Sequence, residues 1–476
     1  MMLTILEIIL QTYFYFVMGY FVLVNFCYAV FLVLSYREIL YYMRHNSFSN
    51  YRSTVQSEIT PPISILAPAF NEEATAVESV RSLLKLNYGK YEVIVVNDGS
   101  KDNTMDRLIR EFRLLPSRQI YRPTLRAERV RDIYKSPMPE YRNLVVVDKE
   151  NGGKADALNV GINVAQYQYV CAIDADSLLE DDALQKVMKP FLEDEHVVAS
   201  GGIVRIANGC EVVNGRVVKV ALSSKLLPIF QVVEYFRAFL SGRMAWQAVN
   251  GLLIISGAFG MFKKSAVIEA GGYNRDTVGE DMELVARIHR TKLEKKEPYR
   301  VVFVPDPVCW TEAPESMSIL SRQRNRWHRG LLDTLLLHKK MLFNGNYGVV
   351  GLAAVPYFFF IELLGPVFEF LGYVSLLGLL ALGILNLNMW ILFFIVALFY
   401  GVMFSVGAVL LEEVSFRRYP KPRDLALLLS CGVLENFGYR QITLWWRIQA
   451  FYDYFVKGVK SWGVMQRKGF STGMIS

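Results

Sequence analysis

Cysteine is scarce in this sequence, with five residues in a chain of 476. No two cysteines form a Cys-x-x-Cys pair, and the sequence contains no evident repeat or low-complexity tract. Disulfide frameworks and zinc sites both need several cysteines at short, regular spacings. We therefore expect neither a disulfide-stabilised fold nor a zinc site. The five cysteines are Cys27, Cys171, Cys210, Cys309 and Cys431.

A continuous basic stripe is also missing, although the net charge is +7, from 52 basic and 45 acidic residues. The basic residues cluster beside apolar segments instead. Anionic lipid headgroups and a phosphorylated substrate explain this pattern at least as well as nucleic acid does. We expect a lipid membrane and a phosphorylated small molecule as partners, and no nucleic acid.

Apolar residues, by contrast, are abundant. They make up 53% of the chain, and the mean hydropathy of +0.24 is high for a soluble protein of this size. The apolar excess is concentrated in residues 13–36 and about 349–411, which are long enough to cross a bilayer. The first segment has neither a basic start nor a small-residue cleavage site, so we expect residues 1–44 to be a retained transmembrane anchor.

Positive charge sets the expected orientation in the cell membrane. Arg37, Arg44 and Arg52 follow the apolar run at residues 13–36, so the positive-inside rule places the long polar block in the cytoplasm. A linker, residues 45–60, precedes that block, and residues 346–456 return to the membrane as transmembrane and interfacial helices. The sequence leaves open whether this multi-pass protein has three, four or five spans, as well as its oligomeric state.

Three carboxylates lie within or beside the C-terminal apolar segments. Glu362, Glu369 and Glu435 would be costly in contact with lipid, so they should face protein or a polar channel. Residues 349–385 are too long for one straight crossing and predict either a kinked span or an interfacial helix followed by a span. Residues 389–411 predict a simpler span. Residues 425–455 favour an interfacial or re-entrant helix pair over a simple span.

Strand, loop and helix alternate through the polar block, which predicts an α/β fold with a mostly parallel sheet covered on both faces. The carboxyl ends of such strands form the ligand-binding edge of the sheet, and Asn71, Asp98 and Asp174 lie there. The predicted buried strands are residues 63–66, 92–96, 143–147 and 169–173.

Residues 115–142 interrupt this alternation with six arginines and four prolines. We interpret them as an irregular insertion, either a solvated basic loop or a contact with lipid headgroups. After the next strand, Gly152 and Gly153 allow close approach of the backbone, and Lys154 stands at a helix start. That combination suits a phosphate group.

Asp174 and Asp176 directly follow the buried run at residues 169–173. Carboxylates at positions i and i+2 of an extended backbone point the same way, and Mg²⁺ or Mn²⁺ bound to a nucleotide diphosphate favours such oxygen ligands. The alternative is a solvated turn, in which Asp176 or Ser177 is the N-cap of a helix over residues 177–189.

Four short motifs follow one another between the membrane segments, and together they are far more specific than any one alone. On these motifs the chain resembles the membrane-embedded family 2 glycosyltransferases, such as the hyaluronan, chitin, cellulose and poly-N-acetylglucosamine synthases. The resemblance implies a Rossmann-like GT-A domain at residues 61–345. The motifs are Asn97-Asp98-Gly99-Ser100, Asp174-Ala175-Asp176, Gly279-Glu280-Asp281 and Gln323-Arg324-Asn325-Arg326-Trp327.

The resemblance also implies roles for individual residues on the donor side. Lys154 would approach the ribose or the diphosphate, Asp174 would contact the nucleotide, and Asp176 would bind Mg²⁺ or Mn²⁺. Asp98 would hold uridine together with the loop after the first strand. The residues of that loop are Ala67, Pro68, Asn71 and Glu72.

On the acceptor side, Asp281, with Glu280 beside it, would be the general base that deprotonates the acceptor hydroxyl. An N-cap role for Asp281, on a helix beginning at Met282, is compatible with this function. Trp327 would stack on the acceptor sugar, and Gln323 and Arg326 would contact the acceptor or the donor diphosphate. The alternative for this motif is an interfacial helix with arginines at the lipid phosphates.

The C-terminal residues 457–476 resemble the cytoplasmic gating segment of hyaluronan and chitin synthases through Trp462 and Arg467. Here Val464-Met465-Gln466 replaces the usual threonine-containing residues, so the segment departs from the family pattern at these three positions.

The expected function is an inverting, metal-dependent hexosyltransferase. It would transfer sugar from a UDP-sugar donor to a growing β-linked polysaccharide acceptor and move the product through its own membrane segments. The alternatives are a transferase that adds one sugar to a lipid carrier and a catalytically silent membrane receptor. The sequence does not identify the donor sugar or the linkage.

Overall fold

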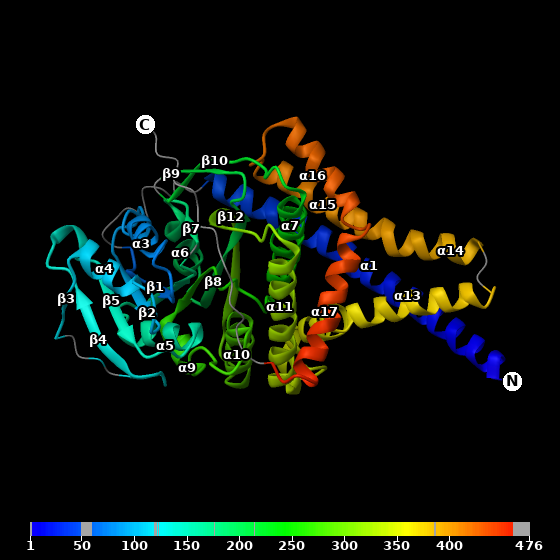
Figure 1. The fold of residues 1–476 in the computed structure, drawn as a ribbon, viewed down its shortest axis with the longest axis horizontal. Coiled ribbons are helices and arrows are strands. Elements are labelled where there is room, and N and C mark those ends of the chain that lie inside the picture. The colour runs from blue at the N-terminus through cyan, green and yellow to red at the C-terminus, as the bar shows by residue number, and fades with distance from the viewer. Residues whose placement is uncertain are drawn as a thin grey trace.

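The computed structural model describes residues 2–48, 60–118, 121, 123–175, 177–213, 215–384 and 387–459. An α/β domain occupies one end of the molecule, and long helices extend away from it at the other end (Figure 1). This arrangement is the one expected for a sheet domain inserted between membrane segments.

The main sheet has ten strands in the order β3-β4-β5-β2-β1-β6-β11-β8-β12-β7. Strands β5, β2, β1 and β6 are parallel to one another, and β11 joins them to β8 in antiparallel pairing. The sheet is therefore mixed, with a parallel part where the sequence predicts it. The parallel strands are β1 (Ile63–Ala69), β2 (Tyr91–Asn97), β5 (Leu144–Lys149) and β6 (Tyr169–Ile173). The others are β7 (Leu178–Leu179), β8 (Val197–Ile206), β11 (Phe259–Lys263), β12 (Arg300–Thr311) and the edge strands given below.

Helices cover the sheet, as the strand and helix alternation predicts. Helix α5 packs on β1 and β2, while α6 packs on β8 and β12. Their first turns follow the carboxyl ends of the strands, which places backbone N–H groups at the ligand-binding edge. The helices of this domain are α3 (Ala76–Leu83), α4 (Thr104–Phe112), α5 (Lys154–Val164), α6 (Ala183–Glu193), α9 (Lys264–Glu269) and α10 (Glu280–Glu294).

Two local expectations are wrong. The insertion at residues 115–142 is not wholly irregular, because β3 (Leu115–Pro116) and β4 (Val130–Lys135) extend the sheet as antiparallel edge strands. The helix expected from residue 177 begins only at Ala183, with Asp182 before it, because Leu178 and Leu179 pair with β12 instead. The N-cap interpretation of Asp176 and Ser177 therefore fails. A separate antiparallel pair consists of β9 (Glu211–Val213) and β10 (Arg216–Lys219).

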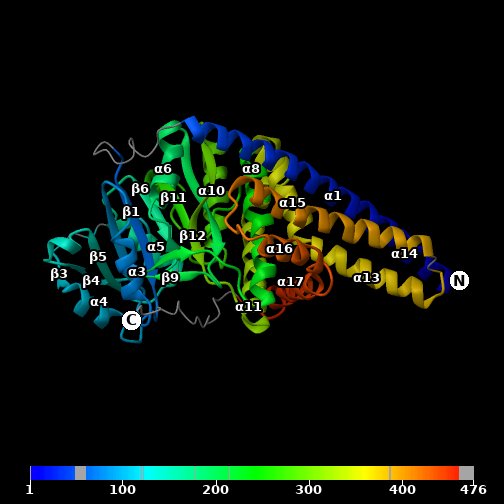
Figure 2. The same cartoon turned by 90° about the horizontal axis from the view of Figure 1, so that it is seen from above.

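Helix α1 (Met2–Phe48) is the N-terminal apolar segment and lies beside α13 and α15. Among the described residues, Thr4–His45 and Leu387–Ser415 are long and apolar enough to cross a membrane. A third candidate is the pair Val350–Leu363 and Gly365–Ala381, bent by 41° as the kinked span predicts. The described residues thus contain two, or up to three, candidate spans, against the three to five expected. Figure 2 shows α1, α13 and α14 extending together away from the sheet.

Helices at the junction connect the sheet domain to these spans. Helix α11 lies beside α17 in both views (Figures 1 and 2). Helix α13 is the second member of the bent pair. The junction helices are α7 (Leu226–Tyr235), the π-helix η2 (Phe236–Arg243), α8 (Met244–Ala248), α11 (Met317–Leu337), α16 (Pro422–Leu434) and α17 (Tyr439–Phe455). The C-terminal apolar helices, which contain the candidate spans, are η5 (Val350–Ala354), α12 (Val355–Tyr357), η6 (Phe358–Leu363), α13 (Gly365–Ala381), α14 (Leu387–Phe394), η7 (Ile395–Phe399) and α15 (Tyr400–Ser415).

Candidate active site

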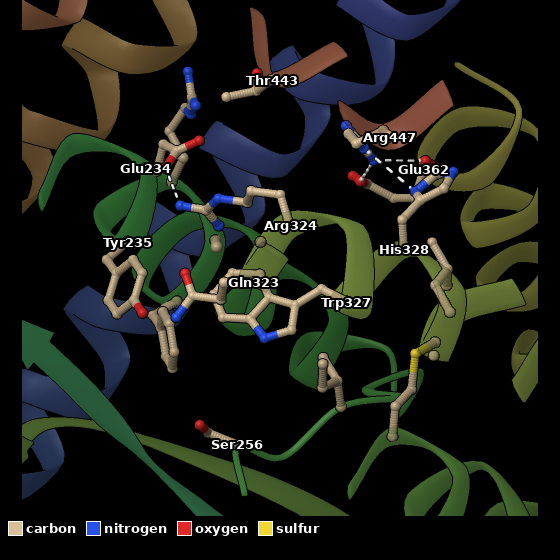
Figure 3. Close-up of a pocket in the computed structure, with 18 of the residues that line it drawn as sticks. Glu234, Tyr235, Ser256, Gln323, Arg324, Trp327, His328, Glu362, Thr443 and Arg447 are labelled. Carbon is tan, nitrogen blue, oxygen red and sulfur yellow. Dashed lines mark hydrogen bonds and ion pairs between the residues drawn. The ribbon is translucent and has the colours of Figure 1, made fainter. Parts of the chain in front are cut away.

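A cavity of about 870 Å³ joins the ligand-binding edge of the sheet to the membrane helices. Its wall at the sheet end includes Lys154, Asp174 and Asp281, and its wall at the membrane end includes Tyr20 and Glu369. Figure 3 shows side chains of α7, α11 and α17 converging on this cavity. Residues from three of the four sequence motifs thus line one space.

Lys154 forms the positive centre of the sheet end. It begins α5, and the preceding Gly153 has φ +87°, a conformation that favours glycine. Its Nζ pairs with Asp174 and lies 3.5 Å from an oxygen of Glu280. Burial alone would lower the pKa of the Lys154 ammonium, but the carboxylates of Asp174 and Glu280 outweigh burial and raise it. A cation is therefore strongly favoured beside Asp174.

Asp281 and Glu280 lie side by side in the first turn of α10 but have different environments. Asp281 Oδ2 accepts a hydrogen bond from the Gly257 N–H at 2.9 Å, and Oδ1 accepts one from Met282 at 2.8 Å. The N-cap position is Gly279, so Asp281 is inside the helix and not its cap. Glu280 is only 3% exposed. Burial raises the Glu280 pKa to about 7, although Lys154 opposes the shift. The more exposed Asp281 is thus the better placed base.

Asp98 is buried and fully engaged by its own surroundings. It pairs with Lys149 and accepts hydrogen bonds from the N–H groups of Gly152 and Gly153 at 3.0 and 2.8 Å. Lys149 also contacts Asp156 at 2.7 Å. These contacts fix the loop that precedes Lys154. Direct contact of Asp98 with uridine remains a prediction.

The loop after β1 is held to the loop after β2. Asn71 has φ +54°, and its Oδ1 accepts a hydrogen bond from the Lys101 N–H at 2.8 Å. Glu72 accepts one from the Thr75 hydroxyl at 2.6 Å. Ala67 and Pro68 lie within β1 itself. The structure thus places these four residues at the expected edge, and their contact with a nucleotide remains a prediction.

The Gln-x-x-Arg-Trp motif lies on α11, where Gln323, Arg326 and Trp327 line the cavity. The Trp327 side chain projects into the cavity (Figure 3), and its residue is 42% exposed. The Arg324 guanidinium lies 4.6 Å from the indole ring centre and pairs with Glu234. An aromatic ring held in this way is suited to stacking on a sugar.

Ion pairs continue along the cavity toward the membrane. Each of the three carboxylates that the sequence places near the membrane has an arginine partner, which confirms that they face protein. The pairs are Glu362 with Arg447, Glu369 with Arg440, and Glu435 with Arg237. Sequence reasoning missed the three arginines. Their occurrence in otherwise apolar helices was the available signal.

The donor set beside Lys154 fits a divalent cation. Mg²⁺ is usually bound by one or two protein carboxylates together with substrate phosphates. Asp174 supplies one such carboxylate in the cavity, and its contact with the Lys154 ammonium shows that positive charge is accommodated there. Among the described residues, no group of three or more His, Cys, Asp and Glu side chains converges as a metal site. Asp176, Trp462 and Arg467 lie outside the described residues.

The fold and the cavity define a class of α/β protein with a polar cavity wall at the carboxyl ends of its strands. Comparison with protein families specifies this class further, because residues 61–330 match the family described as "Glycosyltransferase like family 2". The chain belongs to the family 2 glycosyltransferases, and its sheet domain has the GT-A fold.

Individual relatives have about 30% sequence identity to this chain or less. The chain is 30% identical over 298 residues to the poly-beta-1,6-N-acetyl-D-glucosamine synthase of Staphylococcus aureus (strain COL), covering 62% of this chain and 61% of the relative. The chain is also 30% identical over 274 residues to the same enzyme of Staphylococcus epidermidis. That match covers 58% of this chain and 55% of the relative. The matches therefore span about six-tenths of the length of these relatives. The solved structures that resemble this chain include the mannosyltransferase PcManGT from Pyrobaculum calidifontis in complex with GDP-Man and Mn²⁺. Its sequence is 18% identical to this chain and the TM-score is 0.47. The superposition covers 87% of this chain and 99% of PcManGT.

Proposed function

We propose that this protein is an inverting, metal-dependent glycosyltransferase that extends a β-linked polysaccharide from a UDP-sugar and moves the product through its own membrane segments. One observation carries the proposal. The cavity that contains Lys154, Asp174 and Asp281 continues without interruption to Tyr20 and Glu369 among the membrane helices. An enzyme that only modified a soluble acceptor would have no need of that continuation.

In the proposed reaction, Asp281 takes the proton of the acceptor hydroxyl. The freed oxygen forms a bond to the anomeric carbon of the donor, while the bond from that carbon to the diphosphate breaks on the opposite face, which inverts the configuration. Lys154 orients the diphosphate, and Trp327 holds the acceptor sugar in line. A divalent cation at Asp174 and Asp176 would supply charge neutralisation for the departing diphosphate.

The membrane part of the cavity suits a neutral, hydroxyl-rich chain. Aromatic rings such as Tyr28 and Trp246 line it, and the arginine and glutamate pairs offer hydrogen bonds without leaving an uncompensated charge. The catalytic domain would face the cytoplasm, where the nucleotide sugar is available, as the basic residues after the apolar run at residues 13–36 favour.

Product analysis tests the proposal. Purified protein in lipid nanodiscs is given each UDP-sugar singly with Mn²⁺, and the products are measured by mass spectrometry. UDP-N-acetylglucosamine is the first donor to test, because the relatives named above are poly-N-acetylglucosamine synthases. We expect a ladder of products that differ by one sugar. A single sugar on a lipid would instead support the lipid-carrier alternative.

The metal assignment has its own test. Asp176→Asn removes a ligand charge, so we expect it to abolish the Mn²⁺-dependent part of UDP binding measured by calorimetry. Equal affinity of variant and parent for UDP in Mn²⁺ would contradict the assignment of Asp176 to the metal.

A further inference from the structure

Arg243 is a buried cation on the cavity wall without a carboxylate partner. It ends the π-helix η2, is only 8% exposed and lines the cavity together with Asp281. Its Nη1 atom is buried and has no hydrogen-bond partner, and in the part of the chain that the structure describes no ion pair includes Arg243. An isolated buried guanidinium is unfavourable unless something compensates its charge.

Other cations on the same wall differ in this respect. Six of them form ion pairs with a carboxylate of the described chain, so their charges are already compensated when the cavity is empty. These six are Lys154, Lys225, Arg237, Arg324, Arg440 and Arg447.

Aromatic rings hold the Arg243 guanidinium but do not neutralise it. Its central carbon lies 3.7 Å from the ring centre of Phe239 and 5.6 Å from that of Phe303. Such contacts offset part of the cost of burial and fix the orientation of the planar group, while its N–H donors are not saturated by the rings. Burial lowers the Arg243 pKa to about 10, and Asp281 opposes this shift, so the group keeps its charge at neutral pH.

We propose that Arg243 is an anion-binding residue whose ligand is a phosphate oxygen of a substrate. The proposal rests on the proposed function, because the substrates of such a transferase carry phosphate groups. Arginine is suited to this task, since its fork of N–H donors matches the geometry of phosphate oxygens. Binding would supply the counter-charge that Arg243 lacks in the empty cavity.

The phosphate could come from the donor diphosphate or from a lipid-linked acceptor. Ser241, two residues before Arg243, lies with its Oγ 3.4 Å from Oγ of Ser35 on α1. Ser35 is near the end of the apolar run of α1, just before Arg37, which is where lipid headgroups are expected. Arg243 is therefore close to the membrane level at which the phosphate of a lipid carrier would lie.

The test compares Arg243→Met, Arg243→Lys and the parent, each as the full chain in nanodiscs. Two probes separate the sources: UDP with Mn²⁺, and nanodiscs of phosphatidylcholine with or without a polyisoprenyl monophosphate. We expect Arg243→Met to weaken the binding of one probe by about 10- to 100-fold, as the loss of a charged hydrogen-bonding partner does, and Arg243→Lys to retain part of it. Weaker binding of UDP would show that Arg243 contacts the donor diphosphate. Weaker binding of the lipid phosphate would show that Arg243 contacts a lipid-linked acceptor.

Stability separates this role from a structural one. Arg243→Met leaves no carboxylate without its ion-pair partner, so the substitution should not lower the unfolding temperature of the ligand-free protein. If the cost of burying the guanidinium exceeds the gain from its ring contacts, the substitution should raise that temperature. Arg237→Met is the matched contrast on the same helix, since it leaves Glu435 buried without its partner and should lower that temperature. A destabilised Arg243→Met, or unchanged binding of both probes, would overturn the proposal. Glycosyl transfer by a variant that binds both probes normally would leave the proposed function standing.

Discussion

At the scale of single residues, the two adjacent carboxyl groups of the site, Asp281 and Glu280, have different environments. Asp281 is held by two backbone N–H groups and stays accessible from the cavity, whereas its neighbour Glu280 is buried beside Lys154. Backbone hydrogen bonds favour an ionised carboxylate, and burial disfavours one. Glu280 therefore holds a proton more readily than an exposed glutamate does, while Asp281 is the carboxylate that an acceptor hydroxyl in the cavity can reach.

Asp281→Asn tests the base. The amide keeps the shape of the side chain but cannot take up a proton, so we expect turnover to fall by about 10²- to 10⁴-fold. UDP affinity, measured by calorimetry, should change little because the nucleotide contacts proposed above do not include Asp281. Near-parental turnover would remove Asp281 from the mechanism.

The raised pKa of Glu280 should make the stability of the protein depend on pH. Its pKa is about 7 in the folded protein and ordinarily 4.5. Between these values the folded protein keeps a proton that the unfolded chain releases, so the free energy of unfolding falls as pH rises from about 4.5 to about 7. Glu280→Gln cannot titrate and should flatten the unfolding temperature across this window. The same slope in variant and parent would show that another group causes it.

At the scale of elements, the distance between the base and the acceptor platform depends on two touching glycines. Gly279 precedes α10, which carries Asp281, and Gly330 lies on α11 one turn after Trp327. A Cβ added to Gly330 would lie 2.8 Å from the Cα of Gly279, closer than real side chains approach. The helices can cross at this distance only without side chains.

Gly330→Ala should therefore push α11 away from α10. We expect a loss of stability of about 1–3 kcal/mol, typical of overpacking, and a larger proportional loss of turnover because Trp327 shifts relative to Asp281. Gly345→Ala is the control, since a Cβ there meets nothing within 4 Å. Thermal unfolding and initial rates measure both effects. Parental rates in Gly330→Ala would show that the crossing does not set the geometry of the site.

Some strands and helices could be predicted from the sequence and others could not. The four buried parallel strands were predictable because each is rich in β-branched and other apolar residues and alternates with helical segments, and β6 has the predicted bounds, Tyr169–Ile173. Strands β3 and β4 were missed because their edge position tolerates the arginines and prolines that mask a strand pattern. The start of α6 was missed because Leu178 and Leu179 pair with β12, about 130 residues away, and no local pattern reports such a contact.

The same limit applies to the cavity. The motif residues could be found in the sequence because their types and order are specific. The partner of Glu435 could not, because Arg237 is 198 residues away, and only the packing of α16 against α7 and η2 against α15 brings the two together. The sequence also could not show that Arg243 takes part in no ion pair among the described residues, because that depends on which side chains meet in three dimensions.

At the scale of the whole molecule, export requires the sheet domain and the C-terminal segment to be on the same side of the membrane. The end of α15 returns to the sheet domain, while α14 begins at the end of the molecule where α1 starts (Figure 1). Positive-inside counting agrees, because it places Arg417, Arg423 and Lys457 in the cytoplasm and Asn388 outside. The Trp462 segment would then be on the catalytic side.

Single cysteines at Asn388 and Ser461, in a chain lacking the five native cysteines, test this topology with a membrane-impermeant thiol reagent on intact cells. We expect labelling at position 388 only, because the reagent cannot reach a cytoplasmic thiol. Labelling of both positions after permeabilisation is the control for accessibility. If position 461 were labelled on intact cells, the proposed gating segment would lie outside, where it could not close over a donor bound at Lys154 and Asp174, and the export proposal would fail in this form.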